Sequence, residues 1–323
     1  MKRILLFAFV GAIAALVFAW HATPAVFLHP LLALNRSLSG LQAHTIGAAG
    51  HRVHYLAGGP AAADTPIVLL HGIFAEKDHW VEFARPLTGS WRVVAPDLPG
   101  FGESGRHAHE PYHYQSQVVR LRALLDQLQL GRVHLAGNSM GGTLAVLFAQ
   151  TYPERVASVA LIGSPHGLRT PQASTMDTLI EAGGAPLVAA TPEQFDRMMD
   201  LVFARRPWIP FPVLHRTMTS ATRDAASNLR VWHEQLQDRY LLDERIGGLR
   251  APTLALWGEA DQIFHPSGLR RLRDRVPDAR IEALPGLGHL PMMEAPRETA
   301  EAYARFLRSL PPRGDLSTRS ARR

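Results

Sequence analysis

A serine lies between glycines where a strand-like segment meets a helix-like one. Residues 133–150 read VHLAGNSMGGTLAVLFAQ. The first part is a short apolar run typical of a buried strand, and the second keeps apolar residues at helical spacing. The pattern G-x-S-x-G at such a junction indicates a nucleophile elbow, a strained turn that raises the serine and leaves room only for glycine two positions away. It predicts Ser139 as a nucleophile, with Gly137 and Gly141 making room for it.

A serine hydroxyl is a weak nucleophile unless a base takes its proton and an acid orients that base. At this kind of elbow the chain order is serine, then aspartate or glutamate, then histidine. Asp261, in GEADQIFHP, and His289, in GLGHLP, each follow an expected strand and are the predicted acid and base. Glu259 is the rival acid but still belongs to the end of its strand. His265 is too near Asp261 in sequence to approach the serine independently.

Acyl transfer through a serine also needs two N–H donors for the oxyanion that forms. One is the backbone N–H of Met140, directly after the serine. The other is expected from the loop HGIFAEKD that follows an earlier strand, where Ile73 is the first candidate and Phe74 the second. His71 is expected to brace this loop by hydrogen bonds.

Strand-like and helix-like segments alternate from His51 onward, which predicts a mostly parallel sheet flanked by helices, an α/β fold. The expected strands lie in RVHYLAGG, PIVLLHG, WRVVAPDLPG, VHLAGNS, RVASVALIGSP, PTLALWGEAD and ARIEALPGLGH. Between RVASVALIGSP and PTLALWGEAD, from Ser164 to about Arg250, strand-like runs are missing and prolines interrupt short helical pieces. We therefore expect a helical insertion there.

These patterns divide the chain into four parts. Residues 1–38 are a membrane anchor with a juxtamembrane segment, and residues 39–164 and 250–311 form the α/β core. Residues 165–249 are the inserted helical segment, called the cap below. Residues 312–323 are a basic tail that we expect to be disordered.

The N-terminus begins MKR and continues as an uncharged apolar run over residues 4–20. As a helix this run is about 25 Å long, close to the ~30 Å of a bilayer core. We expect a retained anchor with its basic start in the cytoplasm and the body on the other side. A cleaved signal peptide is the alternative, although residues 20 and 21, Trp and His, suit cleavage poorly. Gly11, Ala15 and Ala19 form a small-residue face through which two anchors could pair as a homodimer.

The net charge of +6 comes from the two ends of the chain, so no nucleic-acid-binding surface is expected on the body. The absence of cysteine excludes disulfides and thiolate chemistry. His107, His109, Glu110 and His113 lie close together, but their spacing does not match a metal-binding pattern. No metal and no cofactor are expected.

Five motifs stand in the order typical of one superfamily: HG at 71–72, DLPGFGES at 97–104, GNSMGG at 137–142, WGEADQIFHP, and GLGHLPMMEAP. Over about residues 45–310 the chain resembles the α/β-hydrolase superfamily. With its anchor, it resembles bacterial membrane-anchored lipases and phospholipases A of the lysophospholipase and monoacylglycerol lipase type. The resemblance implies an acyl-enzyme mechanism on lipid esters, at the periplasmic face of a bacterial inner membrane or, after signal cleavage, outside the cell.

Apolar side chains in and near the cap are candidates for an acyl-chain pocket, although they fit the cap's own core equally well. The residues we expect to bind substrate are Phe74, Phe203, Trp208, Phe211 and Leu290.

Two other functions remain open at this point. Meta-cleavage-product C–C hydrolases share GNSMGG, but they usually carry a glycine-proline-glycine oxyanion loop where this chain has HGIFAEKD. The second alternative is a catalytically idle, membrane-tethered protein that binds fatty acids or a partner. An intact set of three catalytic residues disfavours it.

Overall fold

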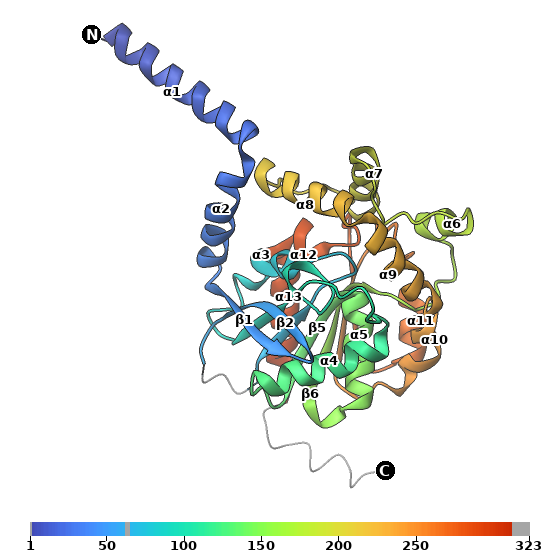
Figure 1. Cartoon of the computed structure of the whole chain (residues 1–323). Helices are drawn as coiled ribbons and strands as arrows, with labels where there is room; N and C mark the ends of the chain where they lie inside the picture. Colours follow the sequence, from blue (N-terminus) through green and yellow to red (C-terminus); the bar gives the residue numbers. More distant parts are fainter. Residues whose placement is uncertain (1, 62–64, 312–323) are drawn as a thin grey trace.

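A central eight-stranded sheet organises the body of the chain in the computed structural model, which describes residues 2–61 and 65–311 (Figure 1). The strand order is β1-β2-β4-β3-β5-β6-β7-β8; β1–β2 and β2–β4 are antiparallel and all other pairs parallel. The strands are β1 (Leu41–Ala48), β2 (His51–Gly58), β3 (Ile67–Leu70), β4 (Val93–Pro96), β5 (Val133–Ser139), β6 (Val156–Pro165), β7 (Thr253–Gly258) and β8 (Arg280–Leu284).

The expected α/β-hydrolase architecture is thus confirmed, with one addition at its start. Strand β1 precedes the point where the sequence alternation begins. Most of its side chains are exposed, so it lacks the apolar pattern that marks a strand in sequence.

Helices cover both faces of the sheet. Successive residues of a strand point to opposite faces, so a strand that is apolar throughout has two faces to bury. In β6, Val159 and Leu161 belong to one hydrophobic cluster, and Ala160 and Ile162 belong to the other. The first cluster packs under α4 (Tyr114–Gln127), α5 (Met140–Thr151) and α11 (Gly268–Arg275); the second packs under α3 (Val81–Ala84), α12 (Pro291–Glu294) and α13 (Pro296–Ser309).

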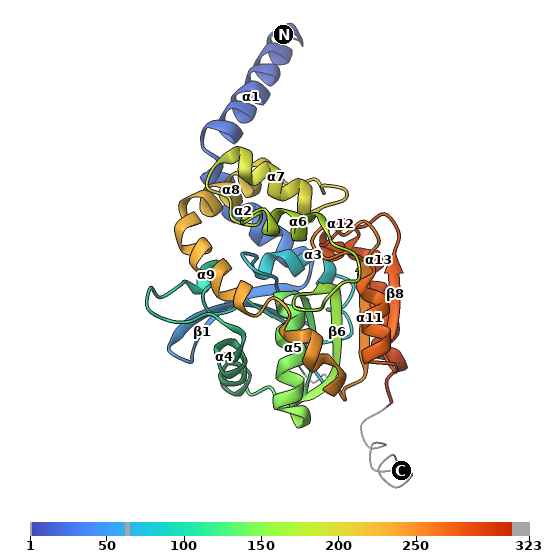
Figure 2. The ribbon, with the colours of Figure 1, turned by 90° about the vertical axis from the view of Figure 1, so that its right-hand side faces the viewer.

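The segment between β6 and β7 is helical and contains no strand among its residues, all of which are described. Its helices are α6 (Thr175–Glu181), α7 (Pro192–Val202), α8 (Phe211–Arg223), α9 (Ala225–Gln237) and α10 (Leu241–Arg245). Both ribbon views place α6–α9 over the end of the body from which the N-terminal helix projects (Figures 1 and 2).

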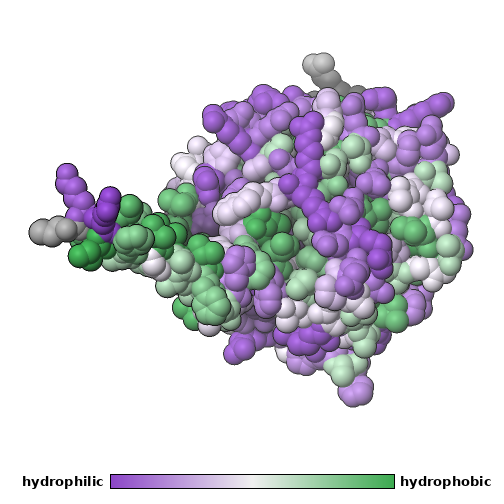
Figure 3. Space-filling model, turned by 90° about the horizontal axis from the view of Figure 1, so that it is seen from above, coloured by the Kyte–Doolittle hydropathy of each residue, from purple (hydrophilic) through white to green (hydrophobic). Residues whose placement is uncertain are grey.

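Two helices precede the sheet. Helix α1 (Lys2–Ala22) has no buried residue and is long and apolar enough to cross a membrane. It extends away from the body, with hydrophobic side chains along its length and hydrophilic ones near its outer end (Figure 3). Helix α2 (Pro24–Leu38) packs against α8 and β1 and so belongs to the body. The basic tail predicted at residues 312–323 lies outside the described residues.

Burial of the central strands predicts how substitutions there change the free energy of unfolding. Leu161 in β6 is fully buried, so Leu161→Ala leaves a cavity and should lower the free energy of unfolding by about 2–5 kcal/mol in urea titration. Val119 on α4 is 58% exposed, and Val119→Ala is the matched control, expected to change stability by less than about 0.5 kcal/mol. Equal losses in the two variants would contradict this assignment of the core.

Candidate active site

Ser139 ends β5 and immediately precedes α5, in a strained backbone conformation. Its φ is +51° and its ψ is −116°, a region that residues other than glycine rarely adopt. Such strain persists only where the surrounding structure enforces it. The first-turn N–H groups of α5 have no intrahelical partner and carry partial positive charge toward the serine.

The glycines on either side are required by space. A Cβ on Gly137 would overlap the backbone of Gly141 and Gly142, and one on Gly141 would overlap the carbonyls of Leu70 and His71. Strand β3 and helix α5 therefore approach more closely than any side chain permits.

Asp261 and His289 meet as a buried pair. His289 Nδ1 lies 3.0 Å from Asp261 Oδ2, and both side chains are almost completely enclosed. The other carboxylate oxygen accepts backbone N–H groups from Ile263 and Phe264 at 2.8 and 3.1 Å. Since a carboxylate only accepts, Nδ1 carries the hydrogen and Nε2 is left free to act as a base.

Ser164, at the end of β6, joins this pair and was not identified from the sequence. Its hydroxyl donates to Asp261 Oδ2 at 2.8 Å and lies 3.2 Å from His289 Nδ1. The sequence LIGSP around Ser164 matches no catalytic motif. The contact becomes visible only in the structure, where Ser164 lies beside the loop that follows β7.

The elbow and the histidine loop are tied together through Asn138. Its side-chain amide donates to the carbonyl of Ile162 at 2.9 Å and to that of His289 at 3.0 Å. In the part of the chain that the structure describes, the Ser139 hydroxyl forms no hydrogen bond. The transfer of its proton to His289 therefore stays a prediction. Catalytic hydrogen bonds often tighten only when substrate is bound.

The loop of residues 72–75, called the oxyanion loop below, follows β3. Ile73 and Met140 line the same cavity as Ser139. Phe74 has a left-handed backbone, with φ of +56°. His71 braces the loop as expected: Nδ1 donates to the Gly72 carbonyl at 2.7 Å, and Nε2 accepts from the Leu98 N–H at 3.0 Å. Burial lowers the pKa of His71 to about 4, so this brace is neutral.

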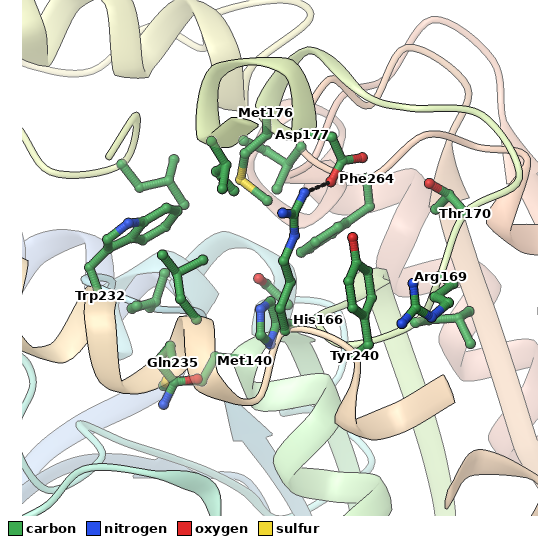
Figure 4. A pocket seen from close by; sticks show the side chains of 18 of the residues that line it. Met140, His166, Arg169, Thr170, Met176, Asp177, Trp232, Gln235, Tyr240 and Phe264 are labelled. Atoms are coloured by element: carbon green, nitrogen blue, oxygen red, sulfur yellow. Dashed lines mark hydrogen bonds and ion pairs between the residues drawn. The ribbon is translucent and has the colours of Figure 1, made fainter. Parts of the chain in front are cut away.

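A mainly apolar cavity opens beside Ser139 and is walled by the cap (Figure 4). Cap residues on the wall include Met176, Ile180, Leu187, Trp232, Leu236 and Tyr240. An ion pair between Arg239 and Asp177, 2.6 Å apart, crosses its upper part.

None of the five residues expected to bind substrate lines this cavity. Phe203 and Leu290 are buried in the second core cluster, and Phe74 packs beside the first. Phe211 contacts the ring of His21, and Trp208 is 85% exposed. Apolar character alone does not tell which way a cap residue faces, and here the cap's own packing accounts for several of them.

His166 is a second histidine beside Ser139, and it was not identified from the sequence. Its ring lines the cavity, its backbone N–H donates to the Ser139 carbonyl at 3.2 Å, and its Nδ1 lies 2.8 Å from the Tyr114 hydroxyl. Burial lowers the pKa of His166 to about 4. The imidazole of His166 in the cavity wall is therefore neutral, and the Tyr114 hydroxyl fixes its orientation.

The rival residues lie elsewhere. Glu259 is exposed, and His265 accepts a backbone N–H from Ser267 at 3.1 Å. In the histidine-rich segment, Glu110 pairs with Arg120 at 2.6 Å and His113 caps α4. Among residues 2–61 and 65–311, no group of three or more His, Asp or Glu side chains is arranged to hold a metal ion.

The chain is similar to several known proteins in sequence and in fold. A family model described as alpha/beta hydrolase fold matches residues 65–296. Lipase 1 of Psychrobacter immobilis is 31% identical over 85% of this chain and 87% of its own length, and mouse monoacylglycerol lipase ABHD6 is 30% identical over 76% of each. A solved membrane phospholipase A, described as a bacterial virulence factor, is 35% identical with a TM-score of 0.86, over 96% of this chain and 99% of that one.

Loss of the hydrogen bond from Ser164 to Asp261 should slow the reaction of Ser139 relative to the wild type. Ser164→Ala removes a hydrogen bond to a charged group, worth ~1.5–3 kcal/mol, and should slow labelling of Ser139 by a fluorophosphonate by roughly 10- to 100-fold. Ser158→Ala on the same strand, whose hydroxyl contacts His134 instead, is the control and should label at the wild-type rate. A Ser164→Ala protein that labels as fast as the control would exclude a role for this contact.

The low pKa of His166 predicts a pH-dependent stability. Between pH 6.5 and 4 the unfolded chain binds a proton that the folded chain does not, so stability is complete above pH 6.5 and is lost as pH falls toward 4. His166→Asn should reduce the slope of unfolding free energy against pH in this range by about 1.4 kcal/mol per pH unit, measured by urea titration. His71 and His79, whose pKa values burial also lowers, should still contribute to the slope that remains. Identical slopes in wild type and variant would refute the assignment.

Proposed function

Because the chain belongs to the α/β-hydrolase family, we propose that it is a membrane-anchored serine hydrolase that cleaves lipid acyl esters with Ser139, His289 and Asp261. Lipases and a membrane phospholipase A among its relatives support lipid ester hydrolysis. The observation that carries the proposal is the strained Ser139 on the wall of an apolar cavity. The buried Asp261–His289 pair beside the elbow supports it further.

The proposed reaction proceeds in two steps through an acyl-enzyme. Ser139 Oγ attacks the ester carbonyl carbon while His289 Nε2 takes the hydroxyl proton. Asp261 holds the imidazole in its Nδ1–H tautomer and stabilises the imidazolium. The backbone N–H groups of Met140 and Ile73 stabilise the oxyanion. The C–O bond then breaks, and the leaving alcohol takes the proton from Nε2.

The second step returns the enzyme to its starting state. Water gives a proton to His289 and attacks the acyl carbon, and the carboxylic acid leaves as Ser139 Oγ regains a proton. Every proton transfer uses the same imidazole, so no metal or cofactor is required for the proposed chemistry.

The anchor determines where this chemistry takes place. We propose that α1 is retained in a bacterial inner membrane, with Lys2 and Arg3 in the cytoplasm and the catalytic body on the periplasmic side. A secreted form after signal cleavage is the alternative. A Cβ added at Gly11 would meet no atom within 4 Å among the residues that the structure describes, so a second copy could approach the small-residue face there.

The substrate class follows from the cavity and the tether. A mostly apolar cavity suits an acyl chain, and a bilayer concentrates acyl esters near the cap. We therefore propose activity of the phospholipase A, lysophospholipase or monoacylglycerol lipase type.

The decisive measurement is acyl release by the detergent-solubilised full-length protein from glycerophospholipids, lysophospholipids and monoacylglycerols. We expect release by the wild type and a loss of at least about 10³-fold in Ser139→Ala, because no other group replaces the nucleophile. Ser158→Ala is the control and should stay active. Intact lipid esters in every sample would refute the lipase assignment. Cleavage of a meta-cleavage-product C–C bond would then favour that hydrolase class, and absence of fluorophosphonate labelling would favour an idle binding protein.

A further inference from the structure

Three consecutive charged residues follow the oxyanion loop: Glu76, Lys77 and Asp78, called the charged triplet below. Each of them forms an ion pair with a different part of the molecule. Lys77 pairs with Asp97 directly after β4, Glu76 pairs with the cap, and Asp78 pairs with the juxtamembrane helix α2. The proposed reaction uses none of the three side chains.

Lys77 fixes the triplet to the core. Its side chain is only 1% exposed, and Nζ lies 2.7 Å from Asp97 Oδ2 and 2.5 Å from Glu103 Oε2. Its backbone N–H also donates to Asp97 Oδ1 at 2.7 Å. Burial opposes the charge on Lys77, but the neighbouring carboxylates outweigh it and raise the pKa of the ammonium. The centre of the triplet is thus held by an enclosed contact between the Lys77 ammonium and the Asp97 carboxyl group.

Asp78 connects the triplet to the helix that follows the anchor. Arg36, in the last turn of α2, donates from Nε and Nη2 to the two carboxylate oxygens of Asp78 at 2.7 and 2.6 Å. Burial opposes ionisation of Asp78, yet the Arg36 guanidinium keeps the pKa of Asp78 below its ordinary value. A two-pronged contact of this kind fixes orientation as well as distance.

Glu76 connects the triplet to the cap through Arg216 on α8. Helix α8 also contacts both N-terminal helices, and the Phe211 ring at its start lies 4.5 Å from that of His21 at the end of α1. The anchor, α2, α8 and the charged triplet therefore form one continuous set of contacts at the end of the body that faces the anchor (Figure 1).

The oxyanion loop lies between this set of contacts and β3. Only Phe74 and Ala75 separate Ile73 from Glu76, and Phe74 has the left-handed backbone described above. His71 holds the other end of the loop. A strained peptide segment keeps its conformation only while both ends are fixed.

We propose that Arg36 and Arg216 are positioning residues for the oxyanion hole, acting through Asp78 and Glu76, so that the seating of α2 and α8 on the body sets the rate of acyl transfer. This inference rests on the proposed function, because it assigns Ile73 a backbone N–H that stabilises the oxyanion. It implies that the juxtamembrane helix contributes to the reaction as well as to tethering.

The test uses the full-length protein in detergent with a short, water-soluble p-nitrophenyl ester, so that access to a membrane does not affect the rate. Arg36→Gln should lower kcat about tenfold with little change in KM, because substrate binding does not depend on the oxyanion contact. Arg36→Lys keeps the charge without the two-pronged geometry and should recover part of the rate. Arg216→Gln should behave like Arg36→Gln.

A trifluoromethyl ketone separates positioning from a merely structural role, since its bound form carries an oxyanion. In Arg36→Gln, the inhibition constant of the ketone should rise by the same factor by which kcat falls. The rates are expressed per active site, and the active sites are titrated with a fluorophosphonate. Arg36→Gln/Asp78→Asn removes both charges, avoids an unpaired carboxylate, and should show the same change in both quantities. Arg122→Gln on α4, whose side chain is partly exposed and pairs with Asp126 and Glu154, is the control and should change neither.

The two proposals fail in different ways. The positioning role alone would be refuted if the variants keep the wild-type kcat and the wild-type inhibition constant for the ketone. It would also be refuted if their loss of kcat disappears once the rate is divided by the concentration of titrated active sites. A wild type that neither hydrolyses the ester nor binds the ketone would refute the proposed function and this inference with it.

Discussion

The close approach of β3, β5 and α5 is the constraint on which the rest of the site depends. Gly137 and Gly141 let backbone meet backbone at distances no side chain allows, and Ser139 accepts a left-handed conformation as a result. The strain is held by a parallel sheet whose central strands are buried on both faces. Without that support, the serine would relax into an ordinary turn with its hydroxyl no longer fixed toward the cavity.

Parallel strand order brings the remaining groups to the same edge. The oxyanion loop follows β3, Ser164 ends β6, Asp261 follows β7 and His289 follows β8. Each of these strands ends at the carboxyl edge, where loops of an α/β sheet collect ligands and reacting groups. The contacts between Ser164, Asp261 and His289 span 97 and 125 residues of sequence, so they exist only because adjacent strands end together.

Three ion pairs of the charged triplet lie where the body meets α2 and α8. Helix α1 is hydrophobic and exposed, whereas α2 returns to the body and presents Arg36 to the half-buried Asp78. Exposed ion pairs contribute little to stability, but the enclosed pairs of the charged triplet fix geometry because leaving one partner unpaired is costly. The same three residues thus link α2, which follows the apolar helix α1, with the loop beside Ser139.

Local pattern in the sequence was enough to predict a mostly parallel α/β sheet, the helical segment between β6 and β7, the elbow around Ser139, and an apolar N-terminal helix, because each depends on spacing within a few residues. The resemblance to α/β-hydrolases came from the order of five motifs along the chain. The sequence also singled out Asp261 and His289, which the structure brings together. It did not reveal β1, Ser164 or His166, since exposed strand residues, a serine and a histidine outside motifs carry no local signal. The direction of side chains in the cap was likewise decided by tertiary packing. Phe203, Trp208 and Leu290 have the apolar character of pocket residues, yet the fold directs them into a core or outward and lines the cavity with Met176 and Trp232 instead.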